Sequence, residues 1–338
     1  MNFTLSDDQL ALAGAMRALC VGHFPLERLR ASESKARVVD AADWEELGRA
    51  GAFSIRTPEA HGGLGLGMAE SVVVFEELGR ALVPGPLADS ALAAGLVDGA
   101  SRGEVVVGSV DRRSGASGAS VPSPSGLPAG PPALIPHLDA LGTLVVVDDD
   151  GLALVDPASV DARPADRSLD PLTPMWIAEG ELPRGERIGG PEGAVGWRYG
   201  LRLLSAAMCV GLAAATLEMA VEHARSREQF GRPIGSFQAV KHICADMLVR
   251  LELARVALHA AAVTADTPEV GDPMRSMAGA TLLALEAALQ NGRQCIQVHG
   301  GMGFTWEVPA HLYLMRARVL QGACGAACEL EETVAQSL

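Results

Sequence analysis

Two stretches of sequence decide the fold, and the first is Arg227–Gln238, which reads REQFGRPIGSFQ. It ends one long helical segment and opens the next through a turn of Gly and Pro. An arginine at such a corner can bind a phosphate as a rigid bidentate fork, and Phe230 offers an aromatic face beside it. An ordinary corner between two helices fits the same residues, with Arg227 in solvent and Phe230 as an apolar plug.

The second stretch is Gln297–Glu307, which reads QVHGGMGFTWE. Three of the four residues from Gly300 to Gly303 are glycine, which removes side chains where a ligand or another backbone must come close. Backbone N–H groups in such a turn can hold an anion, although a plain helix cap would also explain Gly300. Two candidate phosphate-binding turns, about 70 residues apart in the sequence, together predict a dinucleotide lying along a helical bundle.

Helical patterning surrounds both stretches. Apolar residues at helical spacing predict helices over 194–227, 237–264, 274–298, 310–320 and 326–336. Long antiparallel helices with short links predict a four-helix bundle. Nearer residue 1, helices are expected behind the capping box of Ser6 and Gln9, around Trp44, over 69–82 and over 88–97.

The middle of the chain has a different pattern. Runs rich in β-branched residues predict strands at 105–107, 144–147 and 152–155, and short strands are expected to continue to about Glu186. Ser114–Pro132 consists mostly of Ser, Gly, Ala and Pro, a composition that predicts a mobile loop. We therefore predict a mostly α chain in three parts: an N-terminal helical domain (1–100), a short middle β-domain (101–190) and a C-terminal four-helix bundle (191–338).

Composition excludes several classes of function. The chain has 27 Lys and Arg against 41 Asp and Glu, a formal net charge of −14, so counterion release cannot drive it onto nucleic acid. Its first residues lack the basic and apolar regions of a signal peptide, and its longest apolar stretch is shorter than the about 20 residues that span a bilayer. Six scattered cysteines without a CxxC pair fit a reducing compartment. We expect a cytoplasmic protein that does not insert into membranes.

The histidines invite a metal-site hypothesis, chiefly through His223, His242 and His299. No two of them stand four residues apart on one helix with a carboxylate nearby, which is the spacing that helical metal sites use. We assign no metal to this chain.

Taken together, the two stretches resemble the acyl-CoA dehydrogenase family of flavoenzymes in order and spacing. Further similar motifs are Phe3–Gln9, Glu46–Gly48, Pro58–Gly65 and Glu76–Arg80, so the resemblance covers most of the chain. The resemblance implies the family's fold, with an N-terminal helical domain, a middle β-domain and a C-terminal four-helix bundle. That order is the one that the hydrophobic pattern predicts independently.

The resemblance also implies FAD as the cofactor, bound across a subunit interface. In the family, the two matching stretches hold the ADP half of a flavin whose ring lies in the neighbouring subunit. The residues of this chain at those positions are Arg227, Gln229, Phe230, Gln238, Gln297, Gly300 and Gly301. By this resemblance Arg227 would neutralise the pyrophosphate, Phe230 would pack near the adenine, and the two glycines would admit the cofactor backbone.

This chain departs from the family at the catalytic base. The family's glutamate takes the α-proton of an acyl-CoA thioester while a hydride leaves the β-carbon for the flavin. Most members carry it at a position that falls near Gly325 here, and others at one that falls near Leu201, and neither place offers a carboxylate. We therefore assign no catalytic residue. The family's Thr-Glu-Pro and Gly-Ser motifs, which line the flavin ring, also have no counterpart, and Ser114–Pro132 stands in their place.

Three functions remain open. The favoured one is the shortened, non-catalytic subunit of a heterotetrameric acyl-CoA dehydrogenase, in which a full-length partner supplies the base and most of the acyl-CoA cleft. Such pairs resemble the dehydrogenases of actinobacterial steroid side-chain degradation, which implies a steroid side-chain CoA ester as substrate. The second is a self-sufficient homotetramer with a base relocated to Asp246, Glu252, Glu286 or Glu307. The third is a scaffold protein that has lost FAD.

Overall fold

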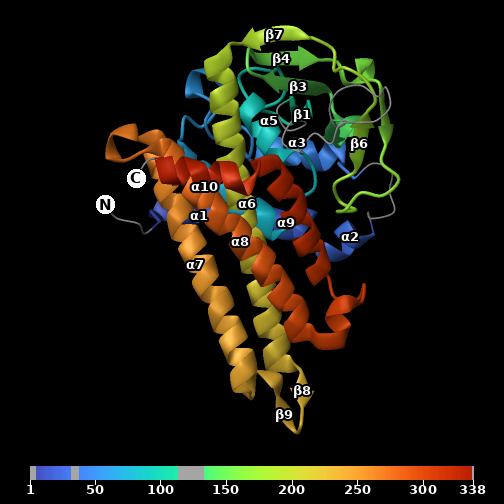
Figure 1. Ribbon diagram of the computed structural model, residues 1–338, viewed down its shortest axis with the longest axis vertical. Coiled ribbons are helices and arrows are strands. Elements are labelled where there is room, and N and C mark those ends of the chain that lie inside the picture. The colour runs from blue at the N-terminus through green and yellow to red at the C-terminus, as the bar shows by residue number, and fades with distance from the viewer. Residues whose placement is uncertain (1–4, 32–37, 113–132, 337–338) are drawn as a thin grey trace. The chain divides into compact units, whose positions relative to one another are not determined.

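The computed structural model describes residues 5–31, 38–112 and 133–336 (Figure 1). Within them the chain forms two compact units. The helical unit consists of Met1–Leu29, Gly67–Val83 and Arg202–Leu338, and the β-containing unit of Arg30–Leu66 and Pro84–Leu201. The predicted loop Ser114–Pro132 lies outside the described residues. The mostly α composition with a small β part is confirmed.

Most of the helical unit consists of long helices, which run side by side in Figure 1. Its helices are α1 (Asp7–His23), α4 (Met68–Arg80), the greater part of α6 (Pro191–Ser226), α7 (Gln238–Asp266), α8 (Pro273–His299), α9 (Ala310–Cys324) and α10 (Ala327–Gln336). The predicted capping box begins α1, since Ser6 accepts from Gln9 N and Gln9 reaches back to Ser6 N. At the centre, buried Asn291 of α8 donates to the carbonyl oxygens of Ala213 on α6 and Met247 on α7.

Glycine allows α4 and α6 to touch backbone to backbone. A Cβ at Gly211 of α6 would overlap the carbonyl oxygen of Glu76 and lie 2.6 Å from the backbone nitrogen of Arg80. A Cβ at Gly79 of α4 would in turn overlap the carbonyl oxygen of Met208. Because only hydrogen fits at both crossings, these two glycines set the distance between the helices.

A buried ion cluster ties α4 to two other helices. Glu77, whose side chain is 5% exposed, accepts from Arg17 Nε at 2.8 Å and Nη2 at 2.7 Å. Glu76 accepts from Arg255 Nη2 at 2.7 Å and Nε at 3.1 Å, and Arg80 lies beside both carboxylates. Bidentate arginine pairs satisfy these buried charges, which would otherwise be costly in a low-dielectric interior.

The β-containing unit has two sheets and short helices. The helices are α2 (Leu26–Arg30), α3 (Ala41–Arg49) and α5 (Leu87–Ala93), of which α2 begins in the helical unit. One sheet has the order β1 (Val107–Asp111), β3 (Thr143–Asp148), β4 (Gly151–Val155) and β7 (Glu186–Gly189), with β1 parallel to β3 and the other pairs antiparallel. The other is antiparallel, with the order β2 (Leu134–Pro136), β6 (Met175–Ala178) and β5 (Ala162–Pro164).

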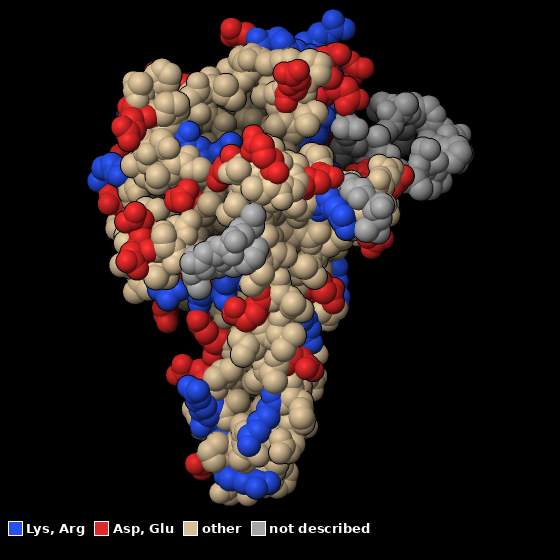
Figure 2. All heavy atoms as spheres, turned by 90° about the vertical axis from the view of Figure 1, so that its left-hand side faces the viewer, with Lys and Arg blue, Asp and Glu red and all other residues tan. Residues whose placement is uncertain are grey.

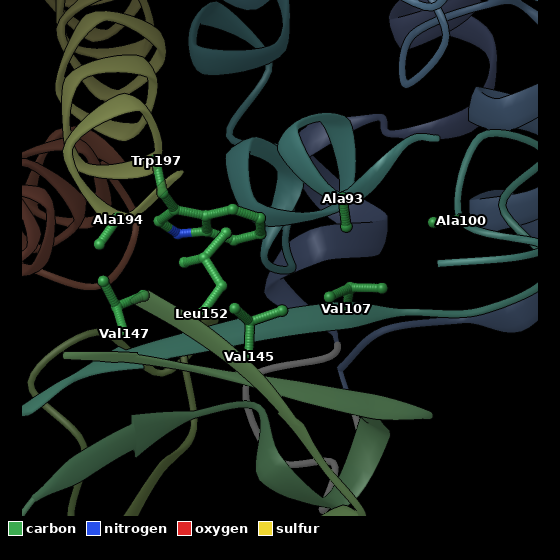
Figure 3. Close-up of a cluster of buried hydrophobic side chains, with 8 residues drawn as sticks. All are labelled: Ala93, Ala100, Val107, Val145, Val147, Leu152, Ala194 and Trp197. Carbon is green, nitrogen blue, oxygen red and sulfur yellow. The ribbon is translucent and has the colours of Figure 1, made fainter. Parts of the chain in front are cut away.

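Strand β3 is buried on both faces, which explains its unbroken apolar run. Side chains alternate along a strand, so Val145 and Val147 point to one face and Leu144 and Val146 to the other. The first face packs against Trp197 and the other side chains drawn in Figure 3, which are Ala93, Ala100, Val107, Leu152 and Ala194. The second face packs against residues of the other sheet, among them Ile135 and Ala178.

The long helix α6 has the apolar composition of a possible membrane-spanning helix. Among the described residues it is the one helix whose length and hydropathy would allow it to cross a bilayer. However, 83% of its most apolar 18-residue window is buried inside the protein. Its apolar surface therefore contacts protein, as in a core helix.

Candidate functional site

The first stretch forms a β-hairpin at the end of α6. Strand β8 (Glu228–Gln229) pairs with β9 (Arg232–Pro233), and Ile234 N donates to Arg227 O at 2.8 Å to close it. Phe230 and Gly231 make the turn with φ of 54° and 74°, as a two-residue hairpin with a matching twist requires. Phe230 is 91% exposed, so it does not plug the corner between the helices.

Aromatic contacts connect this hairpin to the start of α7. The ring of Phe230 meets the edge of Phe237 at a centroid distance of 6.0 Å, and the guanidinium of Arg232 lies 4.2 Å from the Phe237 ring centre. Phe237 directly precedes Gln238, the exposed first residue of α7. Four predicted cofactor residues (Arg227, Gln229, Phe230 and Gln238) are thus within one small, exposed structure.

The second stretch contains the end of α8 and the segment η7 (Gly300–Phe304), and its three glycines have different structural roles. Gly300 has φ of 61° and ψ of −137°, a conformation open to glycine alone. A Cβ at Gly300 or Gly301 would meet no atom within 4 Å, whereas one at Gly303 would overlap the carbonyl oxygen of Ile296. Gly303 is therefore needed for packing, and Gly300 and Gly301 border open space.

Two stacked histidines bring the stretches together. The rings of His223 and His299 have centroids 4.1 Å apart and planes inclined by 25°. His223 lies one helical turn before Arg227, and His299 directly precedes Gly300. The two turns, remote in sequence, consequently meet at one end of the helical unit, where the β8–β9 hairpin lies in Figure 1.

This end is positively charged in an otherwise acidic chain. Figure 2 shows basic side chains gathered at the lower end of the bundle. The stretch 222–242 holds four basic side chains and two acidic ones, and all six are exposed: Arg225, Arg227, Arg232, Lys241, Glu222 and Glu228. Excess positive charge beside open glycine backbone suits an anion of the size of a diphosphate.

Exposed aromatic rings continue past the glycine turn. Phe304 is 82% exposed and Trp306 58%, and Trp306 makes an edge contact with His311 at a centroid distance of 4.5 Å. Large apolar side chains this exposed commonly mark a surface that a ligand or a partner covers.

The backbone near Gly325, where the resemblance places the glutamate of most family members, has a conformation that favours glycine. Gly325 ends α9 with φ of 89° and ψ of −176°, a conformation strained for any residue with a side chain. A Cβ there would lie 3.1 Å from Nη2 of Arg202 and 3.5 Å from Oε2 of Glu329. Arg202 also donates through Nε to Cys324 O at 3.0 Å. The other position, Leu201, is a half-buried residue within α6.

Two carboxylates with unusual surroundings were not expected from the sequence. Glu329 places its oxygen beside Gly325, 3.8 Å from Arg202, with its side chain 54% exposed. In the β-containing unit, Asp89 accepts from the Ser109 hydroxyl, and burial raises the pKa of the Asp89 carboxyl to about 6. Only folding brings either group to these partners, so neither has a local sequence signal.

The four carboxylates proposed as relocated bases are all exposed: Asp246, Glu252, Glu286 and Glu307. Glu252 is moreover paired with Arg255. In the described parts of the chain, no three His, Cys, Asp or Glu side chains gather closely enough to hold a metal ion.

Sequence comparison decides the family. The chain matches the N-terminal domain of acyl-CoA dehydrogenases over residues 6–100 and their C-terminal domain over residues 199–338. The chain belongs to the acyl-CoA dehydrogenase family. The chain is 34% identical to FadE34 of Mycobacterium tuberculosis over 96% of its own length, and it spans 47% of FadE34. It is 33% identical to IpdE2 of the same organism, over 93% of this chain and 92% of IpdE2.

Solved structures confirm the acyl-CoA dehydrogenase fold. The Tcur3481-Tcur3483 steroid enzyme, solved as a G363A variant, is 26% identical with a TM-score of 0.80, and 98% of each chain is covered. PigA with FAD and proline is 19% identical with a TM-score of 0.79, over 100% of this chain and 99% of PigA, and shows the fold alone.

Proposed function

We propose that this chain is the non-catalytic subunit of a heterotetrameric, FAD-dependent acyl-CoA dehydrogenase. The observation that carries this proposal is the backbone at Gly325. A glutamate there would require a conformation that glycine alone adopts easily, so the missing base is a property of the local fold as well as of the side chain. The α,β-dehydrogenation of the thioester then needs a base from another subunit.

The residues at the end of the helical unit fit the ADP half of FAD. Gly300 and Gly301 leave open space for a cofactor backbone, and exposed Arg227 can hold a pyrophosphate through paired N–H donors. Phe230, exposed at the hairpin tip, offers a face to the adenine. Gln229, Gln238 and Gln297 are exposed amides that can bond to the ribose and phosphates.

In this proposal the chain binds and orients, and the partner performs the proton transfer. A bound flavin would supply the acceptor for the hydride that leaves the β-carbon of the acyl-CoA. The glycine turn and Arg227 would hold its diphosphate and so orient the cofactor. Holding the cofactor in this way supplies orientation, one of the larger contributions to catalysis.

The relatives support a two-component arrangement. More than half of FadE34 lies outside the region that this chain spans, which leaves room for a second dehydrogenase-like part. The Tcur3481-Tcur3483 protein, whose name gives two components, is a steroid enzyme. We therefore propose a steroid side-chain CoA ester as the substrate, bound mainly by the partner, in the cytoplasm. We retain the three-domain division at 1–100, 101–190 and 191–338, because the matched family domains leave only the middle part unassigned.

Flavin content with and without a partner tests the proposal. The chain would be expressed alone and together with a full-length acyl-CoA dehydrogenase encoded next to it, and each product would be sized and its bound flavin counted. We expect a colourless lone chain and a yellow complex with about one FAD per pair of subunits, since two half-sites form one site. A colourless complex of the two proteins would favour the scaffold function instead.

A self-sufficient enzyme is the second candidate, because Glu329 brings a carboxylate close to the position expected for the base. If Glu329 were the base, the lone chain would be yellow, and Glu329→Gln would lower its dehydrogenase rate by about 10²- to 10⁴-fold, the usual contribution of a general base. In our favoured function the same substitution leaves the activity of the two-subunit complex within about twofold, because the 3.8 Å ion pair of Arg202 with the half-exposed Glu329 contributes little. Measured rates of both preparations with acyl-CoA and an artificial electron acceptor separate the two candidates.

A further inference from the structure

The stacked imidazoles of His223 and His299 have no role in the function proposed above. Both side chains are half-buried, and they join the two turns that would hold the diphosphate. His223 is one turn from Arg227, and His299 is adjacent to Gly300. A charge on either ring would therefore lie within a Debye length, about 8 Å at physiological salt, of an anion held between Arg227 and Gly300.

In the absence of a bound anion, the surroundings favour the neutral form of His223. Burial lowers the pKa of His223, and the neighbouring His299 and Arg227 lower that pKa further. His299 has a defined tautomer, because its Nδ1 donates to the carbonyl oxygen of Cys295 at 2.8 Å. In this tautomer Nε2 is the ring nitrogen without a hydrogen.

The groups around the pair come from each element packed on it. On α8, Cys295 lies one turn behind His299, and burial raises the pKa of its thiol to about 12. On α7, burial also raises the pKa of the Cys244 thiol, which interacts with Cys295. Both thiols are therefore neutral near pH 7. The segment η7 contributes no titratable side chain.

Further charges lie on α6 and at Arg227, directly after the last residue of that helix. Glu222 and Arg225 flank His223 in sequence and are exposed, so water screens them. Arg227 is the cation that acts on the ring of His223. A bound anion at Arg227 would neutralise this cation and add negative charge, which reverses the field at the pair.

We propose that His223 and His299 together take up one proton from solvent when a nucleotide diphosphate binds at Arg227 and the glycine turn. The proton supplies a second positive charge to the anion site. The stacked rings share one proton, because two imidazolium ions in contact would repel each other. This inference rests on the proposed function, and it adds to that function a dependence of cofactor affinity on pH.

Linkage gives the sign of the dependence. A site that takes up a proton when it binds its ligand binds that ligand more tightly as the pH falls. The effect extends from a pH above the pKa of the liganded pair down to the pKa of the unliganded pair. One proton allows at most a tenfold change per pH unit. We expect the Kd for the diphosphate to fall about tenfold between about pH 8 and about pH 6.

The test uses the two-subunit complex, freed of flavin, and ADP-ribose, whose diphosphate keeps its charge over this pH range and which needs no flavin-ring pocket. Calorimetric titrations at several pH values give the Kd. Repeating them in two buffers of different ionisation enthalpy counts the protons taken up by the unaltered protein. We expect up to one proton per ADP-ribose and the tenfold tightening, whereas binding with a pH-independent Kd and no proton uptake would overturn the inference.

Glutamine variants assign the proton to the pair. His223→Gln and His299→Gln keep a polar side chain without the charge, and each should reduce both the proton uptake and the pH dependence. His61→Gln, an exposed histidine of the β-containing unit, should retain both effects in full. If ADP-ribose fails to bind at every pH, the nucleotide site of the proposed function is wrong and the inference falls with it. Binding without pH dependence rejects the inference alone.

Discussion

Replacing Arg227 by alanine is expected to remove most of the flavin from the assembled dehydrogenase. The side chain is exposed directly after α6, beside open glycine backbone and at the base of the hairpin that carries Phe230. A charge-assisted, bidentate contact to a diphosphate contributes about 2 to 3 kcal/mol, so Arg227→Ala should weaken FAD binding by about 30- to 160-fold. The measurement is bound flavin per complex after dialysis, with the Kd for added FAD obtained from fluorescence quenching.

Two control variants make this result specific. Arg184→Ala removes another exposed arginine, from the β-containing unit, and Glu307→Gln changes a charge just beyond the glycine turn. Both should retain flavin at the level of the unaltered protein. Equal flavin retention in Arg227→Ala and in the two controls would remove Arg227 from the site.

Adding a single methyl group at Gly211 is expected to destabilise the helical unit strongly. The new Cβ would overlap the carbonyl oxygen of Glu76 and sit 2.6 Å from the backbone nitrogen of Arg80, and backbone cannot move aside as a flexible side chain can. Such overpacking costs up to about 3 kcal/mol in the free energy of unfolding. Separating α4 from α6 would also strain the ion cluster that Glu76 forms with Arg255.

Gly196 on the same helix provides the matched control. A Cβ there would meet no atom within 4 Å, and the position is exposed. Gly196→Ala should therefore stabilise α6 by about 0.5 to 1 kcal/mol, because alanine favours helix over glycine. Urea denaturation followed by circular dichroism measures both variants. A Gly211→Ala protein as stable as Gly196→Ala would show that the two helices do not cross at this glycine.

The long helices could be predicted from sequence because their apolar spacing is local. The segments expected at 237–264 and 274–298 are found at Gln238–Asp266 and Pro273–His299. The helix expected over 88–97 ends earlier, at Ala93, because the chain turns at Gly95 with φ of 88°. The β8–β9 hairpin was expected only as a Gly and Pro turn, since two-residue strands are too short for a periodic pattern.

The residues of the candidate site could be predicted from the sequence, but the contacts between them could not. The glycine cluster and the arginine stand out in the sequence, but Gly303 differs from Gly300 and Gly301 only through its contact with Ile296. Likewise, Glu329 follows Gly325 by four residues, and it approaches the expected base position because the chain folds back after α9. Such relations depend on distances in space that no spacing along the chain specifies.

The helical unit is assembled from three separate segments, and this has a consequence for its synthesis. Arg255 follows its partner Glu76 by 179 residues, and a ribosome adding about 5 to 20 residues per second takes roughly 9 to 36 s to cover that distance. During this interval α4 has emerged without Arg255, the partner of Glu76 on α7, and with the part of its surface that α6 and α7 later cover still exposed. The unit can therefore close only late in translation, and slower elongation lengthens the time during which its uncovered apolar surface can aggregate before α7 arrives.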